Sequence, residues 1–389
     1  KPAPPKSEAT DKPFPRDFLT LRRLERLLDE SVPATPLALA GPVTIGPYAD
    51  KTSLERPVDA DESSSSEGTA DGDDAEETPS TPLAETVNSF YMRMMESRGA
   101  PDVLAGILQD VIAIAPDGAT DPEDASRLMH IARFVGIDPD HANAIWNWSN
   151  AFVQLHPQHA TILSMQAALA AHLLNLGDES LNDLITHERL EKQFRQSLDL
   201  DPNKGDNFAR AGSYYLDQEN YGEAERCLAR GFRLMRTSGQ IALKLAEVYS
   251  RTDRPRDAVA VLDMALREGC DDPDVAWEAA LTAVRVEQYE AALTYLDRFD
   301  ELRPGEAWSN HYRACSLLEL NRPAEAMSAL DREQELNPEL TYHVEVQRAS
   351  SLAGMKNVDE FRTQLDRVLA IPVSSIDYLT ANGLQRLYT

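Results

Sequence analysis

Cysteine is scarce in this chain, which has three in 389 residues: Cys227, Cys270 and Cys315. Their odd number and wide spacing exclude a disulfide framework, and no CxxC pair is present to hold a metal. We expect packed thiols in a reducing compartment, hence a cytoplasmic protein. The chain starts at Lys1 and not at Met, so we also expect a processed or partial product, for which export stays open.

Basic residues are also few, with 38 Lys and Arg against 65 Asp and Glu, giving a formal net charge of −27. A nucleic-acid binder needs a surplus of cations for phosphate contacts, and an anionic membrane surface attracts the same residues. No run of 18 apolar residues occurs, so no segment is predicted to insert into a bilayer. These deficits favour protein partners.

Catalytic signatures are missing as well. The sequence contains no GxxxxGK[ST], GxGxxG, HExxH or GxSxG motif. Eight histidines are scattered, and the one pair at near-ligand spacing, His156 and His159, flanks Pro157 in a predicted turn. We therefore expect no enzyme activity, no cofactor and no metal site.

Residues 1–84 differ in composition from the rest. Pro, Ser and Thr are frequent, and no base occurs between Pro57 and Leu83. That stretch holds nine acids, which are Asp59, Asp61, Glu62, Glu67, Asp71, Asp73, Asp74, Glu76 and Glu77. Such a segment has too little apolar surface to offset its ordering entropy and is predicted to be mostly disordered. It is either a solubilising linker or an acidic tail for a basic surface, its own or a partner's.

One island inside this region, residues 17–30, is predicted to be an amphipathic helix. Its apolar residues recur at helical spacing: Phe18, Leu21, Leu24 and Leu28. A helix of this length is marginal alone in water, so its stripe needs a docking partner. The partner is either the rest of this chain or another protein.

From Pro202 onward the sequence is periodic. Prolines that end predicted helices stand at Pro202, Pro304, Pro338 and Pro372, separated by 102, 34 and 34 residues. Four units then start at residues 205, 239, 273 and 307. Their eighth positions are Gly212, Ala246, Ala280 and Ala314. Their twentieth positions are Ala224, Ala258, Ala292 and Ala326. Their twenty-fourth positions are Leu228, Leu262, Leu296 and Leu330.

This pattern resembles the tetratricopeptide repeat (TPR), a 34-residue helical hairpin. Small residues at positions 8 and 20 suit the crossing of the two helices, where only a short side chain fits between the backbones. The resemblance implies an all-α, right-handed α-solenoid of about seven or eight hairpins, with a largely disordered acidic N-terminal segment.

The remaining boundaries follow from weaker matches. Residues 85–160 are predicted to form two divergent TPR-like hairpins, and 161–374 the regular array. About ten extra residues near 174–188 are expected to project from the stack as an insertion. In unit 341–374, Phe361 and Leu365 stand one position late, which predicts one extra residue there. Residues 375–389 are expected to form a capping helix.

The resemblance also implies a concave, partner-binding groove lined by the first helix of each hairpin. Carried onto this sequence, its inward positions give Arg210, Lys244, Arg251, Trp277, Arg285, Trp308, His311, Tyr312 and Tyr342. Arginines and aromatic residues anchor many interfaces, so we expect a partner segment that combines acidic and apolar residues. The alternative is that the aromatic residues pack between neighbouring hairpins. The carboxylate clamp known in the family is not expected, because its positions 5 and 9 hold Ala209 and Ser213.

These observations favour a non-catalytic interaction scaffold or adaptor. One form of this hypothesis adds regulation, in which the N-terminal segment docks on its own chain. Two other interpretations remain open. The chain is the TPR arm of a larger enzyme, such as a glycosyltransferase, or a structural subunit of a secretion or envelope assembly.

Overall fold

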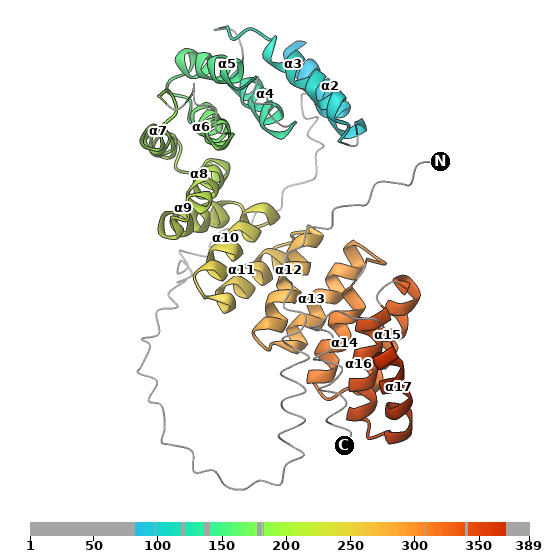
Figure 1. Cartoon of the computed structure of the whole chain (residues 1–389). Helices are drawn as coiled ribbons and strands as arrows, with labels where there is room; N and C mark the ends of the chain where they lie inside the picture. The colour runs from blue at the N-terminus through green and yellow to red at the C-terminus, as the bar shows by residue number, and fades with distance from the viewer. Residues whose placement is uncertain are drawn as a thin grey trace, which may run out of the picture.

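The computed structural model describes residues 82–97, 99–117, 121–135, 141–176, 181, 183–306, 308–338 and 341–370. All regular structure in these ranges is helical, in sixteen helices that follow a curved path (Figure 1). The predicted acidic run, the predicted helix 17–30 and the predicted cap at 375–389 lie outside the described residues. None of the described helices is long and apolar enough to span a membrane.

The helices pack as eight sequential hairpins. In chain order these are α2 (Pro82–Glu96) with α3 (Pro101–Ile112), α4 (Pro122–Phe134) with α5 (Ala142–Leu155), α6 (Ala160–Asn175) with α7 (His187–Leu200), α8 (Gly205–Asp217) with α9 (Tyr221–Leu234), α10 (Gly239–Arg251) with α11 (Pro255–Arg267), α12 (Pro273–Arg285) with α13 (Tyr289–Leu302), α14 (Ser309–Glu319) with α15 (Pro323–Leu336), and α16 (Thr341–Gly354) with α17 (Val358–Ala370). The predicted all-helical array of hairpins is confirmed.

The 34-residue period is visible in the helix starts. The second helices α9, α11, α13 and α15 begin at Tyr221, Pro255, Tyr289 and Pro323, at intervals of 34 residues. The first helices α8, α10 and α12 keep the same interval, whereas α14 begins two residues late, at Ser309. Proline opens several of these helices because its missing N–H would have no helical acceptor there.

The helix crossings are as tight as the small residues predict. A Cβ atom at Gly212 would lie 2.5 Å from Cγ of Leu228 and 3.1 Å from its backbone nitrogen. The alanines at position 20 and the leucines at position 24 are all buried in their units. Close approach of the backbones is therefore what restricts positions 8 and 20 to glycine and alanine.

The last five hairpins turn from their first to their second helix through a residue in the left-handed region. These residues are Glu219, Asp253, Glu287, Asn321 and Lys356, with φ of 56°, 59°, 65°, 57° and 57°. The following N–H then bonds back to the helix, as in Arg254 N–H to Tyr249 O at 2.8 Å and Asn357 N–H to Leu352 O at 3.1 Å. Lys356 comes 35 residues after Asn321, not 34, which places the predicted extra residue in the last hairpin.

One hydrophobic core connects most of the hairpins, from Val87 in α2 to Tyr312 in α14. The two N-terminal hairpins join it although they lack the small-residue pattern. The indole N–H of Trp148 in α5 donates to the carbonyl of Ile114, after α3, at 2.9 Å. The three cysteines are buried and form no disulfide. Burial raises the pKa of Cys227 to about 11, so its thiol stays protonated at neutral pH.

The segment between α6 and α7 differs from the expected projecting insertion. Leu181 is 0% exposed and Ile185 is 1% exposed, and both belong to the main core. These two residues therefore do not project from the stack. Their apolar side chains reach back between the helices, because an apolar residue in a long connection gains by burial wherever the stack leaves room.

We expect Ala258→Leu to lower the free energy of unfolding by about 1–3 kcal/mol through overpacking. Ala258 is 1% exposed at the crossing of α10 and α11, so leucine has no space without moving a backbone. Ala260→Leu, exposed in the same helix, is the matched control and should change stability by less than about 0.5 kcal/mol. Urea denaturation followed by circular dichroism gives both values, and equal effects would contradict the register.

Candidate functional site

A groove runs across the first helices of the four N-terminal hairpins, α2, α4, α6 and α8. Its main cavity measures about 270 Å³. The lining residues are Tyr91, Glu123, Ser126, Arg127, His130, Thr161, Met165, Lys204, Asp206 and Arg210. A smaller hollow of about 40 Å³ continues it along α4, α6 and α8, and Arg210 lines both. We call this surface, together with Arg133 and His172 of the smaller hollow, the N-terminal groove.

Arg210 is the half-buried centre of the N-terminal groove. One guanidinium nitrogen donates to Oγ of Ser164 at 3.2 Å and to Oδ1 of Asn207 at 3.1 Å. The Ser164 hydroxyl donates to the same Asn207 oxygen at 2.7 Å, which fixes this amide with its oxygen towards the arginine. No ion pair to Arg210 occurs among the residues that the structure describes. Neutral oxygens hold the cation in place, and Asp206 stabilises its charge without forming an ion pair.

Burial is the main reason why the pKa of Arg210 is lowered, and the neighbouring charge of Arg133 acts in the same direction against Asp206. Desolvation likewise lowers the pKa of His130, and Arg210 and Arg133 lower it further. The pKa of His172 falls for the same reasons, desolvation and Arg133. These imidazoles are therefore neutral at pH 7, and the charges of the neighbouring arginines oppose their protonation.

Arg133 at the C-terminal end of α4 is exposed and lines the smaller hollow. Within the described ranges it has no hydrogen bond and no ion pair. Arg127, one turn and a half earlier, lies 3.6 Å from Asp124. The three carboxylates that line the groove are Glu123, Asp206 and Asp217. With Lys204, four cations line the groove beside these three carboxylates and Asp124, the partner of Arg127, in a chain whose net charge is −27.

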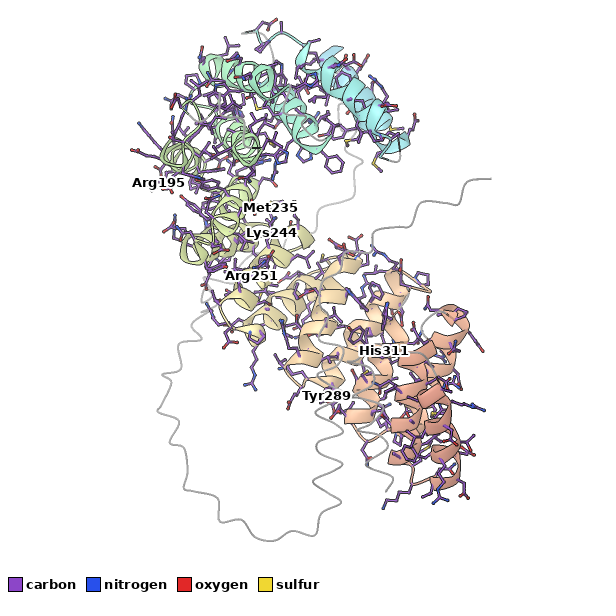
Figure 2. The ribbon with its side chains drawn as sticks, viewed as in Figure 1. Arg195, Met235, Lys244, Arg251, Tyr289 and His311 are labelled. Atoms are coloured by element: carbon purple, nitrogen blue, oxygen red, sulfur yellow. The ribbon has the colours of Figure 1, made fainter. Side chains whose placement is uncertain are left out.

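The three other predicted groove cations stand further along the array. Figure 2 marks Lys244 and Arg251 on α10, where Lys244 is half-buried and Arg251 pairs with Glu247 at 3.1 Å. Arg285 ends α12 and donates to Oγ of Ser250 at 3.1 Å. Arg210 is therefore grouped with Arg133 in the structure, and the predicted line of four cations is divided.

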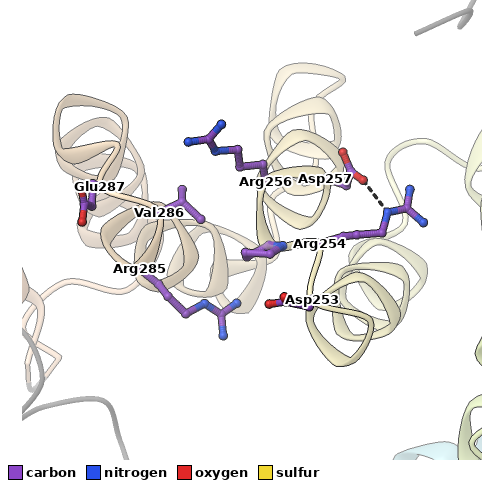
Figure 3. A pocket seen from close by; sticks show the side chains of 8 residues that line it. Asp253, Arg254, Arg256, Asp257, Arg285, Val286 and Glu287 are labelled. Atoms are coloured by element: carbon purple, nitrogen blue, oxygen red, sulfur yellow. Dashed lines mark hydrogen bonds and ion pairs between the residues drawn. The ribbon is translucent and has the colours of Figure 1, made fainter. Parts of the chain in front are cut away.

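Arg285 also lines a hollow of about 590 Å³ between two hairpin turns. Its guanidinium extends towards the carboxylate of Asp253, while Arg254 bonds Asp257 at 2.7 Å (Figure 3). Acids and bases alternate here and neutralise one another. This hollow offers no charge preference for a partner.

The predicted aromatic cluster is largely inside the protein. Trp277 lies 4.9 Å from the ring of Phe299 and 5.5 Å from that of Tyr312, measured between ring centroids. Trp308 lies 5.3 Å from the ring of His311. Tyr312 and His311 are each 5% exposed, which corrects the expectation that both face a partner. The alternative of packing between hairpins accounts for them, while Trp277 and Trp308 are half-buried.

Sequence reasoning missed the reason why these rings sit inside. Trp308 has φ of 78° and precedes α14. The backbone N–H of Trp308 donates to Oε1 of buried Glu333 at 2.8 Å. The backbone N–H groups of Asn310 and His311 donate to Oε2 of the same carboxylate, at 3.1 and 3.3 Å. Glu333, in α15, thus caps the late start of α14 and completes its first turn.

Two further predictions stay untested by geometry. The side chain of Tyr342 lies outside the described residues, although the residue belongs to α16. The docking-helix residues Phe18, Leu21, Leu24 and Leu28 lie outside them too. At the positions of the family clamp, Ala209 is half-buried and the hydroxyl of Ser213 donates to the carbonyl of Ala209 at 2.8 Å, which leaves no basic group there.

Four consecutive hairpins thus repeat every 34 residues, with small residues at each crossing and one left-handed residue in each turn. The chain folds as an array of TPR-like helical hairpins. No protein-family model and no curated protein matches its sequence.

Several solved TPR structures are similar to it. The TPR protein YrrB, described as having an unusual peptide-binding site, is 19% identical with a TM-score of 0.39, covering 54% of this chain and 97% of YrrB. PilF of Pseudomonas aeruginosa is 16% identical with a TM-score of 0.40, covering 56% of this chain and 94% of PilF. Yeast Tom70 is 16% identical with a TM-score of 0.41, covering 80% of this chain and 65% of Tom70. What these chains share at such identities is the repeated helical hairpin.

Proposed function

We propose that this TPR-like protein is a non-catalytic scaffold whose N-terminal groove binds an acidic segment of a partner protein. The observation that supports the proposal most strongly is Arg210, a half-buried guanidinium that is held by Ser164 and Asn207 and makes no ion pair among the described residues. A carboxylate from outside would find a positioned donor that is already partly desolvated. Charge-assisted hydrogen bonds of this kind are about twice as strong as neutral ones.

The rim of the groove adds to the same preference. Arg133 and Lys204 are exposed and make no ion pair among the described residues, so each is available to a partner. Tyr91 contributes a half-buried ring to the same cavity, and Met165 lines it from the core. The groove therefore fits a segment in which carboxylates alternate with apolar side chains, as predicted for the partner from the sequence.

The experiment places a photo-crosslinking residue either at position 127, inside the groove, or at position 233 on α9, the second helix of its hairpin. Captured partners are identified by mass spectrometry, and the partner segment is then purified. Its affinity is measured by calorimetry for the unmodified chain, for Arg133→Glu and for Arg233→Glu. Both arginines are exposed and without an ion pair in the described ranges, so they are matched in kind.

We expect Arg133→Glu to weaken binding at least tenfold, since a close opposite charge is replaced by a like one. Arg233→Glu should leave the affinity within about twofold. Melting curves of both variants verify that the fold is intact. Equal affinity for all three proteins, or capture from position 233 alone, would place the partner surface elsewhere.

A further inference from the structure

The N-terminal groove has a candidate occupant in the same chain. We infer that the acidic run 59–77 occupies this groove when no partner is bound. The inference rests on the proposed function, because it requires that the groove accept acidic segments. It goes further by naming the occupant and the competition that follows.

Charge is the first reason. The run has nine carboxylates and no base, whereas the groove holds three cations, Arg133, Lys204 and Arg210, that have no ion pair among the described residues. Many arginines elsewhere are already engaged by acids of the repeats. Arg236 pairs with Glu268 at 3.1 Å, and Arg254 pairs with Glu225 at 2.9 Å. The run therefore gains more from the groove than from those surfaces.

Tether length is the second reason. Glu77 precedes the first residue of α2, Pro82, by five residues, a span of at most about 18 Å in an extended chain. Tyr91, which lines the groove, stands nine residues into α2, about 14 Å along its axis. A short tether keeps the run at millimolar effective concentration near the groove. Even weak individual contacts then suffice for occupancy.

The consequence is competition. A partner segment must displace the run before it reaches Arg133 and Arg210. Neutralising the run should therefore tighten partner binding without any change in the groove itself.

Lysines give a direct readout of where the run lies. The described part of the chain has four: Lys204 at the groove, Lys244 on α10, Lys192 on outer helix α7 and Lys356 in the last hairpin turn. A carbodiimide joins a carboxylate to a lysine amine only when the two are in contact. The full chain is treated with it, and mass spectrometry counts the bonds from residues 59–77 to each lysine. A mixture of isotopically light and heavy chains separates bonds within one chain from bonds between copies.

We expect bonds within one chain to Lys204 to exceed those to Lys192 and Lys356 at least fivefold. The excess should vanish in Arg133→Glu and in about 0.5 M NaCl, where the Debye length is roughly 4 Å. It should persist in Arg233→Glu. Equal bonding to all lysines, an excess that survives Arg133→Glu, or bonds mainly between copies would each overturn the inference.

The outcome is separable from that of the proposed function. A second variant changes Asp71, Asp73, Asp74, Glu76 and Glu77 to Asn or Gln. Self-docking predicts at least threefold tighter binding of the purified partner segment by this variant. If its affinity is unchanged while Arg133→Glu still weakens binding, the groove stands as the partner site and the inference fails.

Discussion

Glu333→Ala should lower the free energy of unfolding by about 3–4 kcal/mol, the largest single effect that we expect from a polar substitution. The change leaves three backbone N–H groups, of Trp308, Asn310 and His311, without their acceptor in a buried place. Each buried donor without a partner costs about 1–3 kcal/mol, less whatever water can replace. The amide of Asn337, which donates to the same carboxylate at 2.8 Å, also loses its acceptor.

Chemical denaturation with hydrogen exchange gives both the size and the place of this loss. Exchange should rise first in α14, because its start loses the cap. Glu333→Gln keeps one acceptor oxygen and should lose about half as much. Glu335 is exposed two residues later in the same helix, and Glu335→Ala is the control. It should change the free energy of unfolding by less than about 0.5 kcal/mol. If Glu333→Ala changes the free energy of unfolding as little as the control does, the proposed cap does not stabilise α14.

Leu181→Ala should cost about 3 kcal/mol, as deletions of fully buried leucine side chains do. Leu181 is 0% exposed in the connection between α6 and α7, whereas Leu184 is 43% exposed three residues later. The same substitution at Leu184 removes the same atoms without opening a cavity and is the matched control. Thermal and urea unfolding of the two variants give the comparison.

If both leucine variants unfold like the unmodified chain, the connection contributes nothing to the core. That result would support the expectation from the sequence that this connection projects from the stack. A loss confined to Leu181→Ala supports the packing of this connection against the hairpins.

The regular part of the fold could be predicted from the sequence because its cause is local and repeated. In successive units a small residue stands where the two helices cross closely. Gly212 lies against Leu228 in one unit, and Ala258 is buried at the crossing of the next. Four repetitions make the period readable without any relative. Even the extra residue before Lys356 left a trace, in the late positions of Phe361 and Leu365.

The groove was harder to predict, because it depends on which hairpins stand beside one another. Arg133 and His130 belong to α4, in a hairpin without the small-residue pattern, so no register assigned them to a face. A signal existed, namely a histidine and an arginine three residues apart in a helix, but its meaning required α8 and Arg210 alongside.

For the aromatic residues, the sequence predicted a partner-binding role at positions that the structure places largely in the core. The family register places Trp308, His311 and Tyr312 at inward positions, yet α14 starts two residues late and its first turn is built around Glu333. Position 8 of this hairpin keeps its place, because Ala314 is 0% exposed, so the register of α14 itself is not shifted. The register alone therefore could not tell a groove-facing ring from one in the core.

The most direct measurement for the central claim is a charge exchange between the groove and a bound segment. Arg133→Glu is combined with a change to Lys of the partner carboxylate that crosslinks nearest to it, and calorimetry gives the four dissociation constants of the cycle. We predict that each single change weakens binding about tenfold and that the double change recovers most of the loss. If the double change is as weak as the two single losses combined, Arg133 does not contact the segment, and the N-terminal groove is not the binding site.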